Sequence, residues 1–396
     1  MLRVLSVSTL FPSPQRPAFG RFIASQMRAA AATGAVEIVM VNPIGLPPWP
    51  LSRGARYRPL THTPAQSDCG GLPTLHPRFR LVPRIGADGN PARIAHALLP
   101  LTRRLHAERP FDLVDAQFFF PDGPAAAIIA AELGLPLAIK ARGSDILYWS
   151  TRPRALAQMR RAGAQAALLL AVSDALRTDM IALGLPADRI AVHYTGLDRT
   201  RFRPMARKAA RAFVSAVPDL TVWGEGPLLV TPGALIPVKG QRLAIAALDR
   251  LPGAHLALAG AGEDEPALRR FAHERGLAER VQFLGQVSHD LLPQLLSAAD
   301  VVVLPSEREG LANAWVEALA CGTPLVIPDI GGAREVVNGP AAGRIAARDP
   351  AAIAVAVGEI LAAPPSQDAV AAHARHFSWE ENAARLVELW QGIVRR

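Results

Sequence analysis

The stretch that decides the fold is residues 300–328, with the sequence DVVVLPSEREGLANAWVEALACGTPLVIP. Its apolar, β-branched start at 301–304 predicts a short buried strand, which the following Pro-Ser pair ends. Residues 312–320 have the pattern of a helix, and a Cys-Gly-Thr-Pro run separates that helix from a second apolar strand. A strand, a loop, a helix and a strand in this order indicate a parallel α/β sheet.

Two acidic residues stand out in this stretch, Glu309 in the loop and Glu317 in the helix. On one continuous helix they would lie roughly 80° apart at about 100° per residue, so a shared site requires the loop to bend Glu309 round to the helix N-terminus. Backbone N–H groups at a helix N-terminus attract anions. The pattern therefore predicts an anion site with two acids beside it.

The composition indicates a two-domain globular protein. The chain has 396 residues and half of them are apolar, which is enough for two cores. Two cysteines, Cys69 and Cys321, provide neither a disulfide framework nor a metal cluster. Residues 1–10 resemble a buried strand and not a signal peptide, and no run approaches the roughly 18 apolar residues of a membrane span. We therefore expect a cytoplasmic protein without a metal.

The positive charge lies entirely in the first half of the chain. Residues 1–200 hold 23 Lys and Arg against 13 Asp and Glu, whereas residues 201–396 hold 20 against 21. A basic half suits an anionic membrane surface, an acidic substrate or a nucleic acid, and a solubilising surface is the plain alternative. The arginines are scattered without interleaved aromatic residues, which disfavours nucleic acid.

Loops after predicted strands hold the candidate residues of the first half. Residues 11–21 form a Pro-rich loop in which Gly20 precedes a helix, and such a glycine either admits an anion or only shapes the turn. Residues 42–91 lack periodicity and predict a long connection, a place for acceptor contacts or disorder. Arg142 and Asp145 follow the predicted strand at 137–140, as a substrate clamp or as a structural ion pair.

The second half repeats the βα pattern more clearly. Predicted strands at 228–231 and 256–259 are each followed by a Gly-rich loop and a helix. The second of these loops contains Gly260 and Gly262 but lacks the third glycine of a dinucleotide fingerprint, which argues against a dehydrogenase. Residues 201–226 are polar and broken by Pro and Gly, so they predict an interdomain passage.

The motif in residues 309–324 resembles that of the retaining glycosyltransferase family 4, which includes sucrose synthase, sucrose phosphate synthase and bacterial mannosyltransferases. The family pattern E-G-x-x-N-x-x-x-E-A-x-A-x-G-x-P is matched by Glu309, Gly310, Asn313, Glu317, Ala318, Ala320, Gly322 and Pro324. Residues 300–306, 331–335 and 233–240 also resemble family segments. The resemblance extends over nearly the whole chain and is weakest at 42–91.

The resemblance implies the GT-B fold, an α/β architecture of two Rossmann-like, doubly wound domains facing an interdomain cleft. Residues 1–200 would be the acceptor domain and residues 227–376 the nucleotide-sugar domain, with the helix at 377–394 packing back onto the first. The implied activity is transfer of a sugar from a nucleotide diphosphate sugar to a hydroxyl acceptor, in glycolipid or exopolysaccharide synthesis. No cofactor is implied. From the basic first half we expect a lipid-linked acceptor and a peripheral contact of the protein with the anionic inner face of the cell membrane.

The resemblance also implies roles for single residues. Glu317 would accept hydrogen bonds from the ribose hydroxyls and Glu309 from the donor sugar, while Lys239 would neutralise charge on the diphosphate. The implied catalytic residues are Lys239, Glu309, Arg142 and Asp145. The implied donor-binding residues are Gly20, Gly233, Lys239, Gly262, Glu309, Gly310, Leu311, Asn313 and Glu317.

Two positions depart from the family pattern. Ala234 stands where the family has an arginine, so a diphosphate cation is missing; Arg308, Arg334 or Arg142 could replace it. Gln117 stands where another histidine is common. The missing cation keeps a non-catalytic partner subunit open as an alternative, and a nucleotide-sugar epimerase of similar architecture is another. Nucleotide-sugar binding without turnover would indicate the first, and turnover without an acceptor the second.

Overall fold

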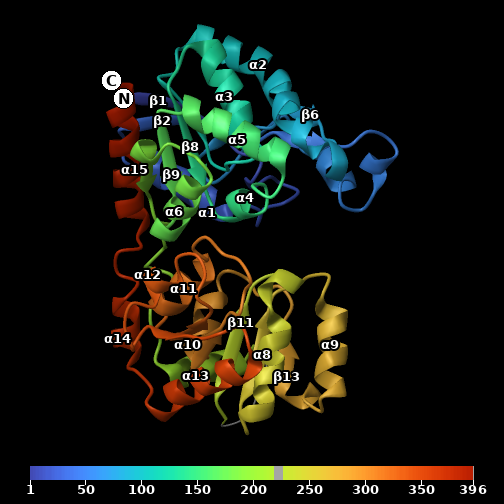
Figure 1. Ribbon diagram of the computed structural model, residues 1–396, viewed down its shortest axis with the longest axis vertical. Helices are drawn as coiled ribbons and strands as arrows, with labels where there is room; N and C mark the ends of the chain where they lie inside the picture. Colours follow the sequence, from blue (N-terminus) through green and yellow to red (C-terminus); the bar gives the residue numbers. More distant parts are fainter. Residues whose placement is uncertain (218–225, 396) are drawn as a thin grey trace. The chain divides into compact units, whose positions relative to one another are not determined.

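The computed structural model describes residues 1–217 and 226–395, which form two compact units (Figure 1). The first unit consists of Met1–Gly196 with Trp379–Arg396, and the second of Leu197–Ser378. Each unit has a mainly parallel sheet with helices on it. This confirms the α/β fold class with two Rossmann-like domains.

The sheet of the first unit has the strand order β10-β9-β8-β7-β1-β2-β5-β4. Its parallel strands are β1 (Leu2–Val7), β2 (Val36–Val41), β5 (Pro73–Leu75), β7 (Leu113–Ala116), β8 (Leu137–Ala141), β9 (Leu168–Ala171) and β10 (Ile190–Val192). Only the edge strand β4 (Gln66–Asp68) pairs antiparallel among the described residues of this sheet. The order reverses between β1 and β7, where such sheets bind ligands.

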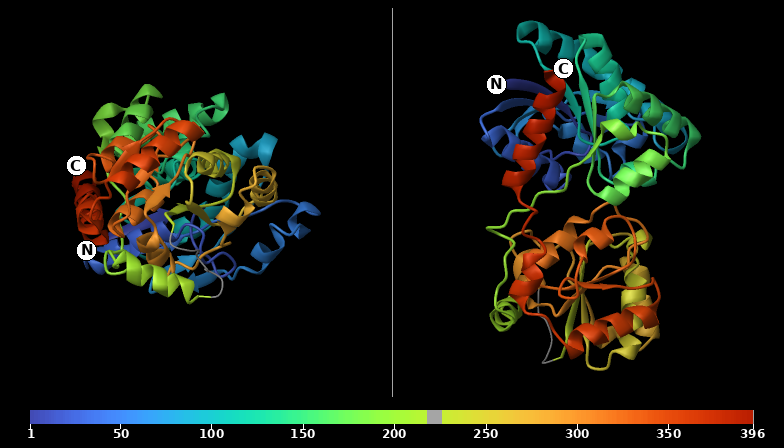
Figure 2. Two further views of the ribbon diagram at one scale, coloured as in Figure 1. Left: turned by 90° about the horizontal axis from the view of Figure 1, so that it is seen from below. Right: turned by 60° about the vertical axis from the view of Figure 1, so that its left-hand side comes forward.

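Helices cover this sheet, and the last helix of the chain is one of them. They are α1 (Arg21–Ala32), α2 (Asn90–Glu108), α3 (Asp122–Leu133), α4 (Ser144–Leu147), α5 (Pro153–Gln165), α6 (Asp174–Ala182) and α15 (Trp379–Val394), with the 3-10 turn η4 (Ala187–Arg189). Helix α15 lies beside α1 (Figure 2), and Leu386 and Trp390 share a buried cluster with Met27. The last helix thus belongs to the first unit, as the resemblance implies.

Residues 42–91 are more regular than expected. They contain the parallel pair β3 (Ile44–Leu46) and β6 (Arg78–Arg80), strands β4 and β5, and the 3-10 turns η1 (Leu51–Arg53), η2 (Arg58–His62) and η3 (Arg84–Gly89). The expectation of one long connection without regular elements is therefore wrong, and acceptor contacts there stay a prediction. Three-residue strands are too short to show a periodicity, and the segment is held by long-range bonds such as Asn42 Nδ2 to the Ser8 carbonyl, 2.8 Å.

The second unit has a six-stranded parallel sheet in the order β13-β12-β11-β14-β15-β16. The strands are β11 (Leu228–Pro232), β12 (His255–Ala259), β13 (Val281–Phe283), β14 (Val301–Val303), β15 (Leu325–Ile327) and β16 (Gly343–Ile345). The order reverses between β11 and β14, so the loops after these two strands meet at the usual ligand-binding point.

The helices of the second unit alternate with its strands. They are α7 (Arg207–Ser215), α8 (Gln241–Ala247), α9 (Glu265–Glu274), α10 (Leu292–Ala298), α11 (Asn313–Ala320), α12 (Ala333–Val336), α13 (Pro350–Ala362) and α14 (Gln367–Ala372), with the 3-10 turns η6 (Pro237–Lys239), η7 (Leu248–Arg250) and η8 (Ala278–Arg280). Helix α11 begins and ends within one residue of the helix expected at 312–320.

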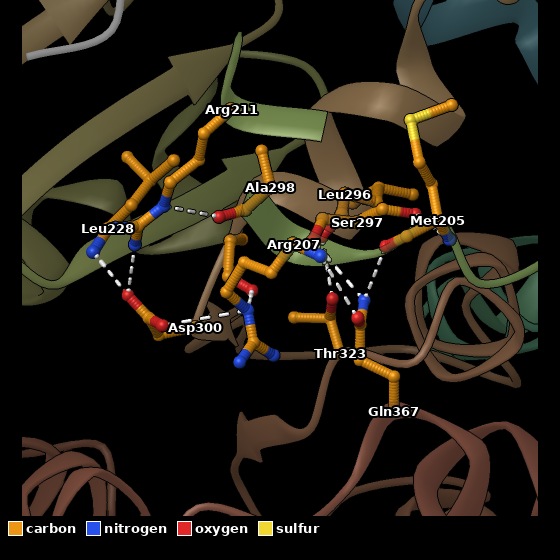
Figure 3. Close-up of polar contacts among 11 residues, drawn as sticks. Met205, Arg207, Arg211, Leu228, Leu296, Ser297, Ala298, Asp300, Thr323 and Gln367 are labelled. Atoms are coloured by element: carbon orange, nitrogen blue, oxygen red, sulfur yellow. Dashed lines mark hydrogen bonds and ion pairs between the residues drawn. The ribbon is translucent and has the colours of Figure 1, made fainter. Parts of the chain in front are cut away.

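The expected interdomain passage at 201–226 contains helix α7, which packs on α10. Arg211 pairs with Asp300 at 2.5 Å, and Arg207 Nε donates to the Ala299 carbonyl at 2.9 Å (Figure 3). Residues 201–217 are therefore an integral part of the second unit and not a free linker. They are polar because their arginines bind other residues of this unit. The remaining residues of the passage, 218–225, lie outside the described part of the chain.

Candidate functional site

The loops after β11 and β14 meet at the switch point of the second unit. The Glu307 amide donates to the Val238 carbonyl at 2.8 Å, which joins the two loops through their backbones. Beside this bond, Lys239 Nζ lies 2.5 Å from Glu309 Oε1. The Lys239 side chain is 25% exposed and that of Glu309 is 14% exposed, so the pair is accessible from solvent. The structure brings together two catalytic candidates that are 70 residues apart in sequence.

Lys239 owes its position to the tight packing of its loop. It ends η6 and precedes Gly240, whose φ of 70° is left-handed. A Cβ at Gly240 would overlap the Pro305 carbonyl, so only glycine lets the β11 loop approach the β14 loop this closely. Gly240 allows the two loops to approach each other, and the Lys239–Glu309 ion pair joins them.

The Glu309 loop is held from its other side by the segment after β15. The Gly332 amide donates to the Gly310 carbonyl at 2.7 Å, and Leu311 is buried with 7% of its surface exposed. The loop leads directly into α11, whose N-cap is Ala312 and whose first residue is Asn313. Because Ala312 has no side-chain acceptor, it does not cap the helix N-terminus, which retains its attraction for anions.

Glu317 lies in α11 and is 15% exposed. Its Oε1 is 3.8 Å from His289 Nε2, and the other ring nitrogen of His289 is 2.8 Å from Arg201. The His289 ring also contacts the Phe202 ring edge to face, with centroids 5.1 Å apart. The sequence interpretation missed His289, since no spacing or motif connects it with Glu317.

Gly233 and Gly262 shape the loops that follow β11 and β12. The Gly233 amide donates to the Ala259 carbonyl at 2.9 Å, and a Cβ at Gly262 would overlap the backbone of Leu235. Two neighbouring loops thus approach each other as bare backbone. The φ of 133° at Gly233 favours glycine, whereas Gly262 is required by this close approach. Gly262 lies one strand away from the Lys239 loop.

Two buried polar atoms near these loops have no hydrogen-bond partner among the described residues. They are Ser306 Oγ, in the loop after β14, and Gln241 Oε1 at the start of α8. The amide nitrogen of Gln241 donates to the Ala234 carbonyl at 2.8 Å. These two oxygens can accept further hydrogen bonds, and the sequence interpretation did not include them.

The arginines considered as substitutes at the Ala234 position have other partners. Arg334 forms a two-pronged ion pair with Asp329, at 2.8 and 2.6 Å, and Arg308 lies 3.6 Å from Glu307. Arg142 belongs to the first unit. Within the second unit, Lys239 is the cation that the structure places beside Glu309.

In the first unit, Arg142 is held by two glutamines. Its guanidinium donates to Gln117 Oε1 at 2.5 Å and to Gln26 Oε1 at 3.3 Å, and it lies 5.1 Å from the Phe22 ring centroid. Burial lowers the pKa of Arg142 to about 10, which leaves it cationic at neutral pH. Arg142 is thus a fixed positive charge at the carboxyl end of β8.

Asp145 accepts hydrogen bonds from backbone amides on two loops. The donors are Phe119 at 2.6 Å, Arg142 at 2.9 Å and Ile146 at 3.1 Å. The contact with Arg142 is therefore made by its amide, and Asp145 positions the loops after β7 and β8. Gly20 likewise has a structural role, since a Cβ there would overlap the Leu10 carbonyl at the start of α1.

A buried polar network lies beneath Arg142. Lys140 Nζ donates to Gln26 Oε1 at 3.0 Å and is 2.5 Å from His193 Nδ1, while His193 Nε2 is 2.9 Å from the Asn382 carbonyl. Burial lowers the pKa of both Lys140 and His193. A neutral His193 with its proton on Nε2 satisfies both contacts, so the network connects α15 with the glutamine that holds Arg142.

Asp122 is another buried polar group of the first unit, and its effect on stability can be tested through pH. It accepts from the Thr9 amide and hydroxyl, both at 2.8 Å, and burial raises its pKa to about 7. Its contribution to stability is therefore fully present below about pH 4 and is lost as the pH rises through about 7. At about 1.4 kcal/mol per pKa unit, the unfolding free energy relative to Asp122→Asn should fall by a few kcal/mol across that window.

Denaturant titrations of the wild type and Asp122→Asn between pH 4 and 8 measure this difference. Asp174→Asn is the matched control, because Asp174 is also in the first turn of a helix but is exposed. An equal pH dependence for both variants would contradict the assignment.

Two family descriptions match the chain, one in each half. Residues 53–201 match "Glycosyltransferase Family 4", and residues 219–377 match "Glycosyl transferases group 1". The second match includes Lys239, Glu309 and Glu317.

The curated relatives include sugar transferases of phosphoinositol lipids. The GDP-mannose-dependent alpha-(1-6)-phosphatidylinositol monomannoside mannosyltransferase of Mycobacterium tuberculosis is 31% identical over 310 residues, 73% of this chain and 78% of that protein. Its counterpart from Mycolicibacterium smegmatis is 33% identical over 261 residues, 62% and 67%. The D-inositol 3-phosphate glycosyltransferase of Mycolicibacterium gilvum is 36% identical over 207 residues, 50% of this chain but 46% of its own length.

Solved structures share the fold at low sequence identity. The sucrose-phosphate synthase of Thermosynechococcus elongatus superposes with a TM-score of 0.78 at 19% identity, covering all of both chains. The Anabaena protein HepE in complex with UDP gives a TM-score of 0.74 at 19% identity, covering 99% of this chain and 100% of HepE. These similarities confirm the GT-B architecture.

Proposed function

The chain belongs to the glycosyltransferases of family 4 and group 1, and from this premise we propose that it is a retaining enzyme with a lipid-linked hydroxyl acceptor. The observation that carries the proposal is the Lys239–Glu309 pair at the switch point of the second unit, 2.5 Å long and open to solvent. A cation and a carboxylate at adjacent strand ends suit a donor with a diphosphate and a sugar.

In the proposed donor complex the ion pair opens to the substrate. Lys239 moves from Glu309 to the diphosphate oxygens, and the freed Glu309 carboxylate accepts hydrogen bonds from hydroxyls of the sugar. The uncapped N-terminus of α11 faces the same diphosphate, and Glu317 accepts from the ribose. Charge on the diphosphate is largest as the sugar leaves, so Lys239 stabilises the transition state more than the bound donor.

The proposed transfer takes place on one face of the sugar. The bond between the anomeric carbon and the diphosphate oxygen breaks as the bond to the acceptor oxygen forms, and the departing phosphate takes up the acceptor proton. No side chain needs to bond covalently to the sugar in this scheme, so the configuration at the anomeric carbon is retained. Arg142, fixed by Gln117 and Gln26 in the first unit, is a positive charge that suits a phosphate group of a substrate.

The acceptor class follows from the relatives. Two of them are named for acceptors that combine inositol hydroxyls with a phosphate, and one of these acceptors is a lipid. For this chain we propose a lipid-linked acceptor of comparable chemistry, a hydroxyl close to a phosphodiester, at the inner face of the cell membrane. The basic first half of the chain supports this assignment.

The test is a panel of nucleotide diphosphate sugars. A donor that binds the native state raises the melting temperature. The donor giving the largest shift is then assayed for transfer to inositol phosphates and to lipid extracts, and the anomeric configuration of the product is read by NMR. A donor that binds without any turnover would indicate a non-catalytic subunit, and an inverted product would exclude the retaining mechanism.

Glu317→Ala is expected to weaken nucleotide binding about 10- to 100-fold, because a hydrogen bond to a charged acceptor contributes about 1.5–3 kcal/mol. Titration calorimetry with a nucleoside diphosphate and with its 2′-deoxy analogue tests the assigned partner. The wild type should prefer the ribose form, and Glu317→Ala should bind both forms equally. Glu274→Ala, an exposed acid of α9, is the control. An unchanged ribose preference in Glu317→Ala would contradict the role of Glu317.

A further inference from the structure

The segment between β3 and β4 forms an arm, defined as residues 47–62. It contains η1 and η2 and extends from the sheet beside β6, in blue in Figure 1. Two of its apolar side chains are exposed, Trp49 at 72% and Leu51 at 56%. Leu51 lies in a tight turn, which the Arg53 amide closes by donating to the Pro50 carbonyl at 3.0 Å, and Trp49 directly precedes this turn.

The arm is strongly and exclusively basic. Arg53, Arg56 and Arg58 are exposed, and within the described residues none of them forms an ion pair. No acidic residue occurs between Glu37 and Asp68. Residues 1–87 contain ten arginines and only these two acids, so this part of the chain has a net charge of +8, against +9 for the whole chain.

The base of the arm is fixed although its tip is exposed. Arg78 donates to the Thr61 carbonyl at 2.8 Å, Arg16 donates to the Arg56 carbonyl at 3.0 Å, and Leu60 is buried. Arg16 also lies 5.7 Å from the ring centroid of Phe19, which is 42% exposed. The arm and the loop before α1 thus form one surface with exposed aromatic, aliphatic and guanidinium groups.

We propose that this surface docks the enzyme on an anionic bilayer, with Trp49 and Leu51 inserted among the lipid headgroups. Tryptophan favours the membrane interface because its ring is apolar and its N–H is polar, and neighbouring arginines are attracted to anionic lipids. The exposed apolar side chains of the arm suit the membrane interface, and its arginines suit the anionic headgroups. The inference rests on the proposed lipid-linked acceptor, to which membrane docking gives access. Among the described residues, none of the helices has the length and apolarity to cross a bilayer.

Vesicle sedimentation of the full chain tests the proposal. Vesicles of phosphatidylglycerol with phosphatidylcholine should bind the wild type more tightly than phosphatidylcholine alone, and less tightly as salt rises. Trp49→Ser/Leu51→Ser is expected to weaken binding at least tenfold, whereas Val355→Ser, at an apolar residue of α13 that is 62% exposed, should leave binding unchanged. Arg53→Gln/Arg58→Gln should weaken it about fivefold per arginine, unlike Arg250→Gln/Arg270→Gln in the second unit.

Vesicles with brominated acyl chains report insertion directly. They should quench wild-type fluorescence, and Trp49→Phe should bind the vesicles but lose this quenching. Absence of binding to anionic vesicles would overturn the proposal, and so would equal loss in the Val355 control. Displacement of the vesicles by single-stranded oligonucleotides that themselves quench Trp49 would assign the surface to nucleic acid instead.

The donor assay separates this inference from the proposed function. The arm variants should retain the wild-type thermal shift with the nucleotide sugar, because the arm belongs to the first unit and the donor loops to the second. Failure of vesicle binding with an intact donor shift would overturn only the docking surface. Absence of any thermal shift of the wild type with nucleotide sugars would overturn the proposed function.

Discussion

Lys239→Met is expected to lower kcat about 100-fold or more, with a smaller change in KM. Removing one group that stabilises transition-state charge typically has this effect, about 3 kcal/mol of barrier. Methionine retains most of the aliphatic length of lysine without its charge. The ion pair with Glu309, 2.5 Å long, places the ammonium of the β11 loop beside the β14 loop. Initial rates with saturating donor measure the effect.

Three further variants separate catalysis from structure at this position. Lys208→Met changes an exposed lysine of α7 in the same unit and should leave kcat unchanged. Glu309→Gln breaks the same ion pair from the other side, so its melting temperature shows how much stability the pair provides. Lys239→Arg retains the charge in a different shape and should recover part of kcat. A Lys239→Met enzyme within twofold of the wild-type kcat would refute the assigned role.

Local sequence patterns predicted that Glu309 and Lys239 lie in loops after strands, and the family resemblance made them candidates for the proposed donor site. Lys239 and Glu309 each follow a short apolar strand, and ligands bind at the carboxyl ends of such strands. The 2.5 Å contact between them depends on β11 and β14 being neighbours, which is a property of the strand order. Periodicity within one strand carries no information on which strand lies beside it, so the contact itself could not be predicted.

The features that the sequence did not predict share one cause. His289 reaches Glu317 only in the folded unit, and Asp145 is committed to amides up to 26 residues away in sequence. Helix α7 was predicted to be a linker because its sequence is polar. Its arginines in fact bind Asp300 and backbone carbonyls of distant segments. In each case long-range polar contacts decide the role of the residue, and such contacts leave no pattern in neighbouring positions.

Gly331→Ala is expected to remove at least nine-tenths of kcat/KM, although Gly331 has no proposed contact with the substrate. Its φ of 46° is left-handed, and a Cβ there would overlap the carbonyl oxygens of Glu309 and Gly310. The added methyl must displace the loop that positions Glu309. A shift of about 1 Å in a positioning loop can lower activity 100-fold.

Gly276→Ala separates this displacement from backbone strain. Gly276 has a φ of 68°, and nothing lies within 4 Å of the position of its Cβ. It should therefore lose only the about 1–2 kcal/mol of a left-handed alanine, with unchanged activity. If Gly331→Ala acts by moving Glu309 away from Lys239, the double variant with Lys239→Met should lose less than the sum of the two single effects. Fully additive losses would show that Gly331 acts elsewhere in the unit.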